Sequence, residues 1–174
     1  VEQVLKLYSK NSQFQILDVG TGCGCLLLSI LKERPNFYGT GVDISKKTIE
    51  ISKFNANKLN LNNRVKFVHS CIDNFNVGKY DVVVSNPPYI KLLDIKYLER
   101  EVVSFEPKLA LKGGFDGFSL IRKVIKKTNN LIKKNGKLIL EIGYDQKNKT
   151  KEILKKEGFY INKSIKDYGN NDRC

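Results

Sequence analysis

The chain has 174 residues, 41% of them hydrophobic, and its 31 basic and 18 acidic residues give a formal net charge of +13. No apolar run approaches the roughly 18 residues that a membrane-spanning helix needs, and Val1–Lys10 has the pattern of an amphipathic helix instead of a signal peptide. These features exclude a membrane protein and predict a globular chain in a reducing, cytoplasmic compartment of bacterial or organellar type.

Short apolar runs alternate with helical patterns along the chain. In chain order, the expected elements are strand Phe14–Val19, helix Cys25–Lys32, strand Phe37–Val42, a helix capped by Ser45, strand Arg64–His69, strand Tyr80–Ser85, helix Asp116–Lys134, strand Lys137–Ile142, helix Asp145–Glu157 and strand Phe159–Ile165. A turn is expected at Asn135-Gly136, and Gly158 should end the last helix. The alternation predicts one domain over Val1–Cys174 with a doubly wound, mostly parallel α/β sheet. Ligands of such sheets bind at the carboxyl ends of strands, so functional residues should follow strands.

The basic charge, the cysteines and the histidine indicate whether nucleic acid or a metal ion should be expected as a ligand. Only five basic residues are Arg, and the Lys residues are dispersed along the chain, which favours compositional bias over a phosphate-binding face and makes nucleic acid the less favoured partner. The cysteines lack the paired spacing of a zinc site, so reduced thiols and no metal are expected. They are Cys23, Cys25, Cys71 and Cys174. The only histidine, His69, is expected to be structural.

A glycine-rich segment, D-V-G-T-G-C-G at Asp18–Gly24, lies between the first strand and the first helix. Gly20 and Gly22 permit a sharp turn and close approach of a ligand to the backbone. The carboxylate of Asp18 would repel a pyrophosphate but suits a ligand that carries an ammonium or sulfonium group. Asp43 ends the second strand, where a carboxylate can accept both hydroxyls of a ribose. Together these features favour a ligand site over an isolated turn followed by a helix cap.

The segment Asn86-Pro87-Pro88-Tyr89 directly follows the fourth strand. Its prolines fix the backbone and remove two donors, so the Asn86 side-chain oxygen and the Pro87 carbonyl remain as acceptors beside the flat ring of Tyr89. This set suits a planar –NH2 group, whose two hydrogens would be held while the nitrogen lone pair faces an electrophile. Such a nitrogen is a poor nucleophile, so its reaction depends on positioning and needs no strong base.

These motifs together make the chain resemble class I S-adenosylmethionine-dependent methyltransferases, which have a Rossmann-like fold. Within that class it resembles the release-factor glutamine methyltransferase family. The resemblance covers nearly the whole chain and is carried by the segments Ile16–Gly24, Val84–Ile90, Phe105–Leu111, Gly113–Gly117, Glu141–Gln146 and Asp167–Arg173. The N-P-P-Y motif alone is shared with N6-adenine methyltransferases, so the later segments select the glutamine branch.

The resemblance implies S-adenosylmethionine as cofactor. It also implies that the methyl acceptor is the side-chain amide nitrogen (N5) of the glutamine in the Gly-Gly-Gln motif of peptide-chain release factors. The implied cofactor-binding residues are Asp18, Gly20, Thr21, Gly22, Cys23, Gly24, Asp43, Ile72 and Asn86. The implied substrate-binding residues are Asn86, Pro87, Pro88 and Tyr89, and the catalytic ones are Asn86, Pro87 and Tyr89. A monomer whose protein partner is a release factor is expected.

The chain departs from the family pattern in the turn after the third strand. Cys71 stands where the family has Asp, with Asp73 as the candidate substitute, and Ile72 replaces an aromatic residue beside the adenine. Weaker cofactor affinity is therefore expected. The family's N-terminal helical domain and its last strand are expected to be missing from this chain.

Three functions are compatible with these observations. Glutamine N5-methylation is the leading one. N6-adenine methylation of DNA or RNA is favoured by N-P-P-Y and by the basic charge, but the chain has no spare segment to hold a flipped base. A truncated, inactive copy is favoured by Cys71, Ile72 and the missing ends, and is opposed by the intact Asp18, Asp43 and N-P-P-Y.

Overall fold

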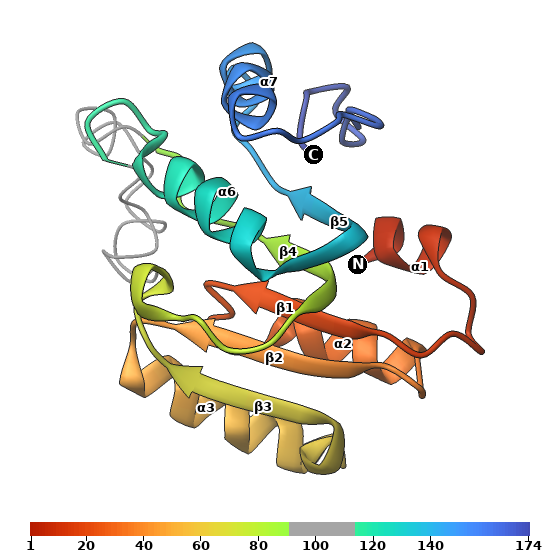
Figure 1. The fold of residues 1–174 in the computed structure, drawn as a ribbon. Coiled ribbons are helices and arrows are strands. Elements are labelled where there is room, and N and C mark those ends of the chain that lie inside the picture. Colours follow the sequence, from red (N-terminus) through yellow and green to blue (C-terminus); the bar gives the residue numbers. More distant parts are fainter. Residues whose placement is uncertain (91–113) are drawn as a thin grey trace. The chain divides into compact units, whose positions relative to one another are not determined.

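The computed structural model describes residues 1–90 and 114–174, which form a five-stranded sheet and its helices (Figure 1). The strands are β1 (Gln15–Val19), β2 (Tyr38–Asp43), β3 (Val65–His69), β4 (Tyr80–Ser85) and β5 (Ile132–Leu140), in the spatial order β3-β2-β1-β4-β5. Strand β1 pairs in parallel with β2 and β4, and β2 pairs in parallel with β3. The predicted doubly wound, parallel α/β sheet is confirmed. The segment Phe105–Leu111 and Gly113 lie outside the described residues.

The contacts of the chain divide it into two compact units. The first unit comprises Val1–Ser85 and Asn130–Ile139, and the second comprises Asn86–Asn129 and Leu140–Cys174. The α-helices are α1 (Glu2–Leu7), α2 (Cys25–Glu33), α3 (Lys46–Lys58), α6 (Ser119–Leu131) and α7 (Lys147–Lys156). The single domain expected over Val1–Cys174 stays a prediction.

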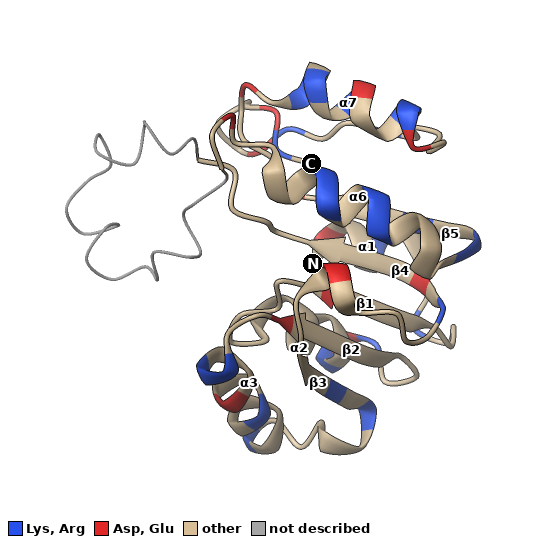
Figure 2. Cartoon of the chain, turned by 60° about the vertical axis from the view of Figure 1, so that its left-hand side comes forward, with Lys and Arg blue, Asp and Glu red and all other residues tan. Residues whose placement is uncertain are grey.

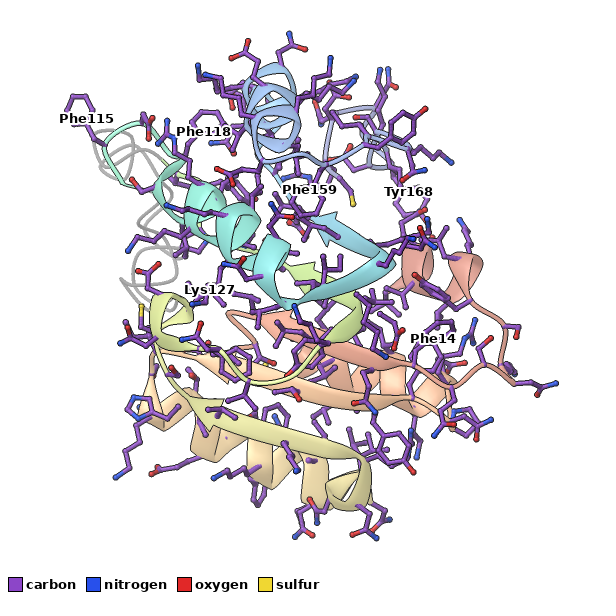
Figure 3. All side chains as sticks on the ribbon, in the orientation of Figure 1. Phe14, Phe115, Phe118, Lys127, Phe159 and Tyr168 are labelled. Carbon is purple, nitrogen blue, oxygen red and sulfur yellow. The ribbon has the colours of Figure 1, made fainter. Side chains whose placement is uncertain are left out.

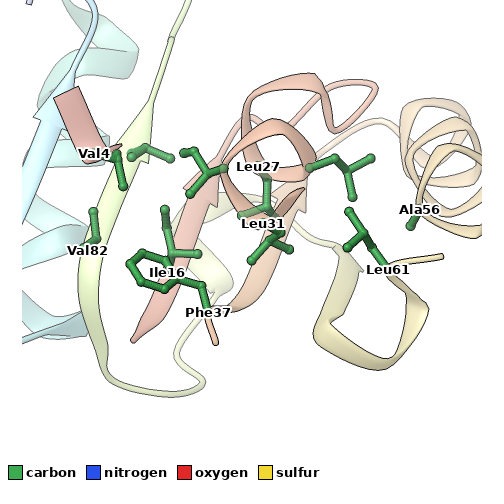
Figure 4. Packing of buried hydrophobic residues seen from close by; sticks show 11 residues of the cluster. Val4, Ile16, Leu27, Leu31, Phe37, Ala56, Leu61 and Val82 are labelled. Atoms are coloured by element: carbon green, nitrogen blue, oxygen red, sulfur yellow. The ribbon is translucent and has the colours of Figure 1, made fainter. Parts of the chain in front are cut away.

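The core of the first unit forms where α2 packs on the sheet (Figure 4). The helix contributes four buried apolar side chains, Leu27, Leu28, Ile30 and Leu31. Gly39 of β2 leaves room for them, because a Cβ there would lie 2.8 Å from the Cδ1 of Leu27. The apolar spacing of α2 therefore decides which of its faces meets the sheet.

Aromatic side chains close this core beside the start of β1. The ring of Phe14, labelled in Figure 3, lies 4.5 Å from the ring of Tyr8 and 5.4 Å from that of Phe37 between centroids. Phe37 is fully buried. Tilted and edge-on contacts of this kind stabilise beyond the area they bury, so they hold the segment that leads from α1 into β1.

Local signals in the sequence fix several helix ends. The hydroxyl oxygen of Ser45 accepts a hydrogen bond from the Thr48 amide at 3.3 Å, so the predicted cap of α3 is confirmed. Gly158 follows α7 with a φ of +81°, which confirms the predicted end of the last helix. The first helix is shorter than the expected Val1–Lys10, because the backbone is already extended at Tyr8.

The expected boundary between helix Asp116–Lys134 and strand Lys137–Ile142 is wrong. Helix α6 ends at Leu131 and β5 begins at Ile132. Lys133 forms an ion pair with Asp81 of β4 at 2.8 Å, which helps hold its segment extended. The left-handed backbone that an Asn-Gly pair favours is present, with a φ of +65° at Asn135, but it lies within the strand.

The expected strand Phe159–Ile165 is also wrong, because these residues form no strand. Ile165 bonds instead with the last residues of the chain: its amide donates to the Cys174 carbonyl at 2.7 Å, and its carbonyl accepts from Arg173 at 2.9 Å. A single antiparallel bridge joins Lys166 to Asp172. An alternating pattern marks an extended segment but does not supply a neighbouring strand for it.

Many residues of the described helices are charged. Lys and Arg are visible on α3, α6 and α7 in Figure 2. Within residues 1–90 and 114–174, no helix has both the length and the apolar character needed to cross a bilayer. No group of three or more metal-binding side chains was found in the same ranges.

We expect Leu31→Ala to lower the free energy of unfolding by about 2–5 kcal/mol, because it leaves a cavity between α2 and the sheet. The matched control is Leu7→Ala on the exposed side of α1, where the loss should stay below about 1 kcal/mol. Urea titration followed by circular dichroism measures both. Equal losses in the two variants would contradict the position of this core.

Candidate functional site

The glycine loop, Gly20–Gly24, is closed by hydrogen bonds to the end of β2. The Val42 carbonyl accepts from the amides of Gly20 and Thr21 at 2.8 and 3.1 Å. The Gly22 amide donates to Oδ2 of Asp43 at 2.8 Å, and the Ser45 amide donates to Oδ1 at 2.9 Å. The Asp43 carboxylate thus fixes the glycine loop and the start of α3 together.

Asp18 lies beneath the loop instead of facing outward. Only 1% of the residue is exposed, and Oδ2 accepts a hydrogen bond from the Thr21 hydroxyl at 2.8 Å. Burial raises the pKa of Asp18 to about 7. The Thr21 hydrogen bond opposes this rise, and the neighbouring Asp43 carboxylate adds to it. Near neutral pH, Asp18 therefore divides between its charged and neutral forms.

The loop leaves room for a ligand at its glycines. Gly20 and Gly22 have φ values of +74° and +56°, and a Cβ at either position would meet no atom within 4 Å. Their backbone is thus open to close approach, which only glycine permits in this conformation. An ionised carboxylate has about four lone-pair positions, and backbone amides use two of those on Asp43. These residues fit the ribose and amino-acid parts of S-adenosylmethionine.

The turn after β3 lies beside Asp43. In the strand pairing His69 stands opposite Asp43, and the Ser70 amide donates to the Asp43 carbonyl at 2.9 Å. Ile72 is buried and begins the 3₁₀ helix Ile72–Asn74. Cys71 stands where the family resemblance leads us to expect Asp. Its thiol lies 3.7 Å from Oδ2 of Asp73, so a carboxylate is still present in this turn.

The sequence also allows predictions for His69 and for the cysteines near the glycine loop. His69 shares a hydrogen bond of 2.9 Å between Nε2 and the Ile44 carbonyl, in keeping with a structural role. The thiols of Cys23 and Cys25 are free and exposed. The Cys23 carbonyl accepts from the side-chain amide of Asn55 on α3 at 2.9 Å. Helix α3 therefore holds the glycine loop from a second side.

The N-P-P-Y segment begins where β4 ends. The Ser85 hydroxyl, buried at that point, donates to the Val19 carbonyl at 2.7 Å and joins the ends of β4 and β1. Asn86 is exposed, Pro87 is buried, and Tyr89 is partly buried. The strand ends of the first unit thus lie at one edge of the sheet, as the sequence predicts.

Tyr89 is held by two side chains that are not predicted from the sequence as site residues. Gln146 Nε2 donates to the Tyr89 carbonyl at 3.1 Å, and Arg173 Nη1 donates to the Tyr89 hydroxyl at 3.1 Å. Both lie in segments that carry the family resemblance, Glu141–Gln146 and Asp167–Arg173. Their position in these segments is the only sign in the sequence that they matter. Their contact with Tyr89 could not be predicted, because both lie far from it along the chain.

A family model described as a methyltransferase domain matches residues 10–171. The chain belongs to this methyltransferase domain family. The fold agrees. A solved methyltransferase from Pyrococcus furiosus aligns over 99% of this chain and 77% of its own, with a TM-score of 0.70 and 21% identity. The ribosomal protein L11 methylase of Lactobacillus delbrueckii subsp. bulgaricus aligns over 95% of this chain and 68% of its own, with a TM-score of 0.68 and 18% identity.

Sequence relatives of this methyltransferase domain include larger proteins. The release factor glutamine methyltransferase of Caulobacter vibrioides is 37% identical over 99% of this chain and 60% of its own length. A bifunctional methyltransferase of Rickettsia bellii is 34% identical over 99% of this chain and 31% of its own length. The domain therefore spans less than two thirds of these relatives.

The raised pKa of Asp18 predicts that stability falls as the pH rises. Below about 3.8, its ordinary pKa, the carboxyl is protonated in both the folded and the unfolded chain, and its favourable contribution is fully present. Between pH 3.8 and about 7 only the folded chain keeps the proton, so the contribution is lost as pH rises through the folded pKa.

Asp18→Asn should abolish this pH dependence. One pKa unit corresponds to about 1.4 kcal/mol, so the variant should gain at most about 4 kcal/mol over the wild type between pH 4 and 7. Urea unfolding at a series of pH values measures this difference, with the exposed Glu50→Gln on α3 as control. Parallel curves for Asp18→Asn and the wild type would contradict the burial of an ionisable carboxyl.

Proposed function

We propose that this methyltransferase domain transfers a methyl group from S-adenosylmethionine to the side-chain amide nitrogen of the glutamine in the Gly-Gly-Gln motif of a peptide-chain release factor. The single observation that carries the proposal is the hydrogen bond from the Gly22 amide to the Asp43 carboxylate, at the carboxyl edge of the parallel sheet. It fixes a glycine loop whose backbone leaves space for a ligand. The similarity to release factor glutamine methyltransferases over 99% of the chain supports the substrate.

The glycine loop and Asp43 are proposed to bind the cofactor. Asp43 would accept the ribose hydroxyls, and the open backbone at Gly20 and Gly22 would admit the amino-acid end. Asp18 and Thr21, joined by a hydrogen bond at 2.8 Å, would support the loop from below. The list of proposed cofactor residues is completed by Cys23, Gly24, Ile72 and Asn86. When bound, the cofactor supplies an electrophilic methyl group.

The N-P-P-Y segment is proposed to hold the methyl acceptor. The Asn86 side-chain oxygen and the Pro87 carbonyl would accept the two hydrogens of the amide nitrogen. Tyr89 would pack against the planar group, and Pro88 would keep the turn rigid. The acceptor nitrogen is weakly nucleophilic because its lone pair is delocalised, so orientation contributes much of the rate. The nitrogen's surplus proton leaves after methyl transfer.

The partner is proposed to be the release factor itself, bound by this chain as a monomer. The alternative of N6-adenine methylation is favoured by one observation, the Lys and Arg residues along α3, α6 and α7 (Figure 2). A nucleic-acid substrate would make binding fall steeply with salt. A protein amide held by short hydrogen bonds would show a shallow salt dependence, so transfer at two salt concentrations separates the two substrates.

We expect calorimetric titration to give micromolar binding of S-adenosylmethionine and of its demethylated product. Asp43→Ala should weaken both by about 100-fold, because it removes the acceptor for the ribose and the partner of the Gly22 amide. The control is Glu50→Ala, an exposed carboxylate on α3 that should leave binding unchanged. Absence of binding by the wild type at millimolar ligand would overturn the proposal.

Asn86→Ala should lower kcat for methyl transfer to a release factor by about 100-fold or more, because the acceptor nitrogen loses its orientation. Binding of S-adenosylmethionine should weaken less than the rate falls, by under about 10-fold, because Asn86 is only one of several proposed cofactor residues. Transfer of a radiolabelled methyl group gives the rate, and Asn63→Ala on the exposed side of the 3₁₀ helix Asn62–Arg64 is the control. Unchanged turnover in Asn86→Ala would exclude the proposed role.

A further inference from the structure

Tyr89 is fixed at both of its ends inside the second unit. Its carbonyl accepts from Nε2 of Gln146 at 3.1 Å, and its hydroxyl accepts from Nη1 of Arg173 at 3.1 Å. Neither donor comes from the N-P-P-Y segment, so this residue is held through the fold of the second unit as well as by the adjacent prolines. Two separate constraints thus act on one residue, one on its main chain and one on its side chain.

Gln146 joins three loops through one buried amide. Besides Tyr89, its Nε2 donates to the Gly117 carbonyl at 3.1 Å, and its Oε1 accepts from the Gly143 amide at 3.0 Å. Only 2% of Gln146 is exposed. A side-chain amide has two donor hydrogens, and both are used here. A buried amide satisfied in this way fixes its neighbours, because any displacement leaves a polar group unpaired.

The space around the Tyr89 ring is filled on the side of Gly143. A Cβ at Gly143 would lie 3.2 Å from Cδ2 of Tyr89 and 3.2 Å from Oε1 of Gln146. The ring therefore lies close beside Gly143, where a larger residue would crowd it. Its position follows from packing as well as from the two hydrogen bonds.

Arg173 is itself held rigidly. Its Nε and Nη2 donate to Oδ2 of Asp167 at 3.2 and 3.0 Å. Its carbonyl accepts from the Ile142 amide at 2.8 Å, and its amide donates to the Ile165 carbonyl at 2.9 Å. Because Arg has only donors, the Tyr89 oxygen must accept, and the phenolic hydrogen is not used in this contact.

We infer that Gln146 and Arg173 are positioning residues for the N-P-P-Y segment. They hold the main chain and the ring of Tyr89, so that the acceptor group meets a surface of fixed orientation. This inference rests on the proposed function. A displacement of about 1 Å at such a surface can cost about 100-fold in rate, so loss of either contact lowers kcat while leaving cofactor binding intact.

A double-mutant cycle between Arg173 and Tyr89 tests the ring contact by methyl transfer to a release factor. Arg173→Ala and Tyr89→Phe should each lower kcat by about 10-fold. The double variant should also lose only about 10-fold, because both changes remove the same hydrogen bond. Arg173→Lys should recover part of the rate. A multiplied loss of about 100-fold in the double variant, or unchanged kcat in Arg173→Ala, overturns the inference.

Gln146→Glu tests the main-chain contact. The variant keeps the acceptor for Gly143 but turns a carboxylate oxygen toward the carbonyls of Tyr89 and Gly117. We expect kcat to fall by about 10-fold or more with the dissociation constant for S-adenosylmethionine within about 2-fold of wild type. Gln13→Glu and Lys163→Ala, both exposed, are the matched controls. An unchanged kcat counts against the inference.

A measurement without turnover separates this inference from the proposed function. The protein is labelled with 3-fluorotyrosine, and the ¹⁹F signal of Tyr89 is assigned by its loss in Tyr89→Phe. The signal should shift or broaden in Arg173→Ala and in Gln146→Glu but not in Lys163→Ala. If the wild type transfers no methyl group, the proposed function fails, and this signal alone decides the inference. A Tyr89 signal that neither variant changes overturns it.

Discussion

The Asp43 carboxylate connects the parts of the first unit that carry the cofactor proposal. One of its oxygens accepts from Gly22 and the other from Ser45, so the same side chain closes the glycine loop and begins α3. The loop could adopt this shape only with glycine at its left-handed positions. The geometry is therefore set by the chain before any ligand binds, which lowers the entropy that binding must overcome. Asp18 supports the loop from below at a cost in stability that grows with pH.

The second unit uses the same principle on an aromatic residue. Gln146 and Arg173 fix Tyr89 with hydrogen bonds from parts of the chain that lie more than fifty residues away. Buried, fully satisfied polar groups stabilise little in net terms but specify a unique arrangement. A reaction that depends on orienting a weak nucleophile benefits from such specification more than from a strong base. Phe115 and Tyr168, labelled in Figure 3, are aromatic side chains of the same unit that are exposed instead.

Much of the sheet could be predicted because its strands are short apolar runs followed by polar residues, as in Tyr80–Ser85. The closeness of the glycine loop to Asp43 could be predicted because both follow neighbouring strands of one strand-helix-strand unit. The features that could not be predicted depend on contacts between residues far apart in the sequence. The alternating pattern predicted a strand at Phe159–Ile165, but these residues form no strand, and the backbone of Ile165 bonds with Arg173 and Cys174 instead. The roles of Gln146 and Arg173 depend on tertiary contacts that no spacing encodes.

The most direct test of the cofactor site is nuclear magnetic resonance of ¹⁵N-labelled protein during titration with S-adenosylmethionine. We expect saturable changes in the amide signals of Gly20–Gly24 and of Ser45, whose amide donates to Asp43. The signal of Glu50, on the exposed face of α3, should change little. Saturable changes confined to α6 and α7, with the glycine loop unaffected, would exclude the cofactor site at Asp43.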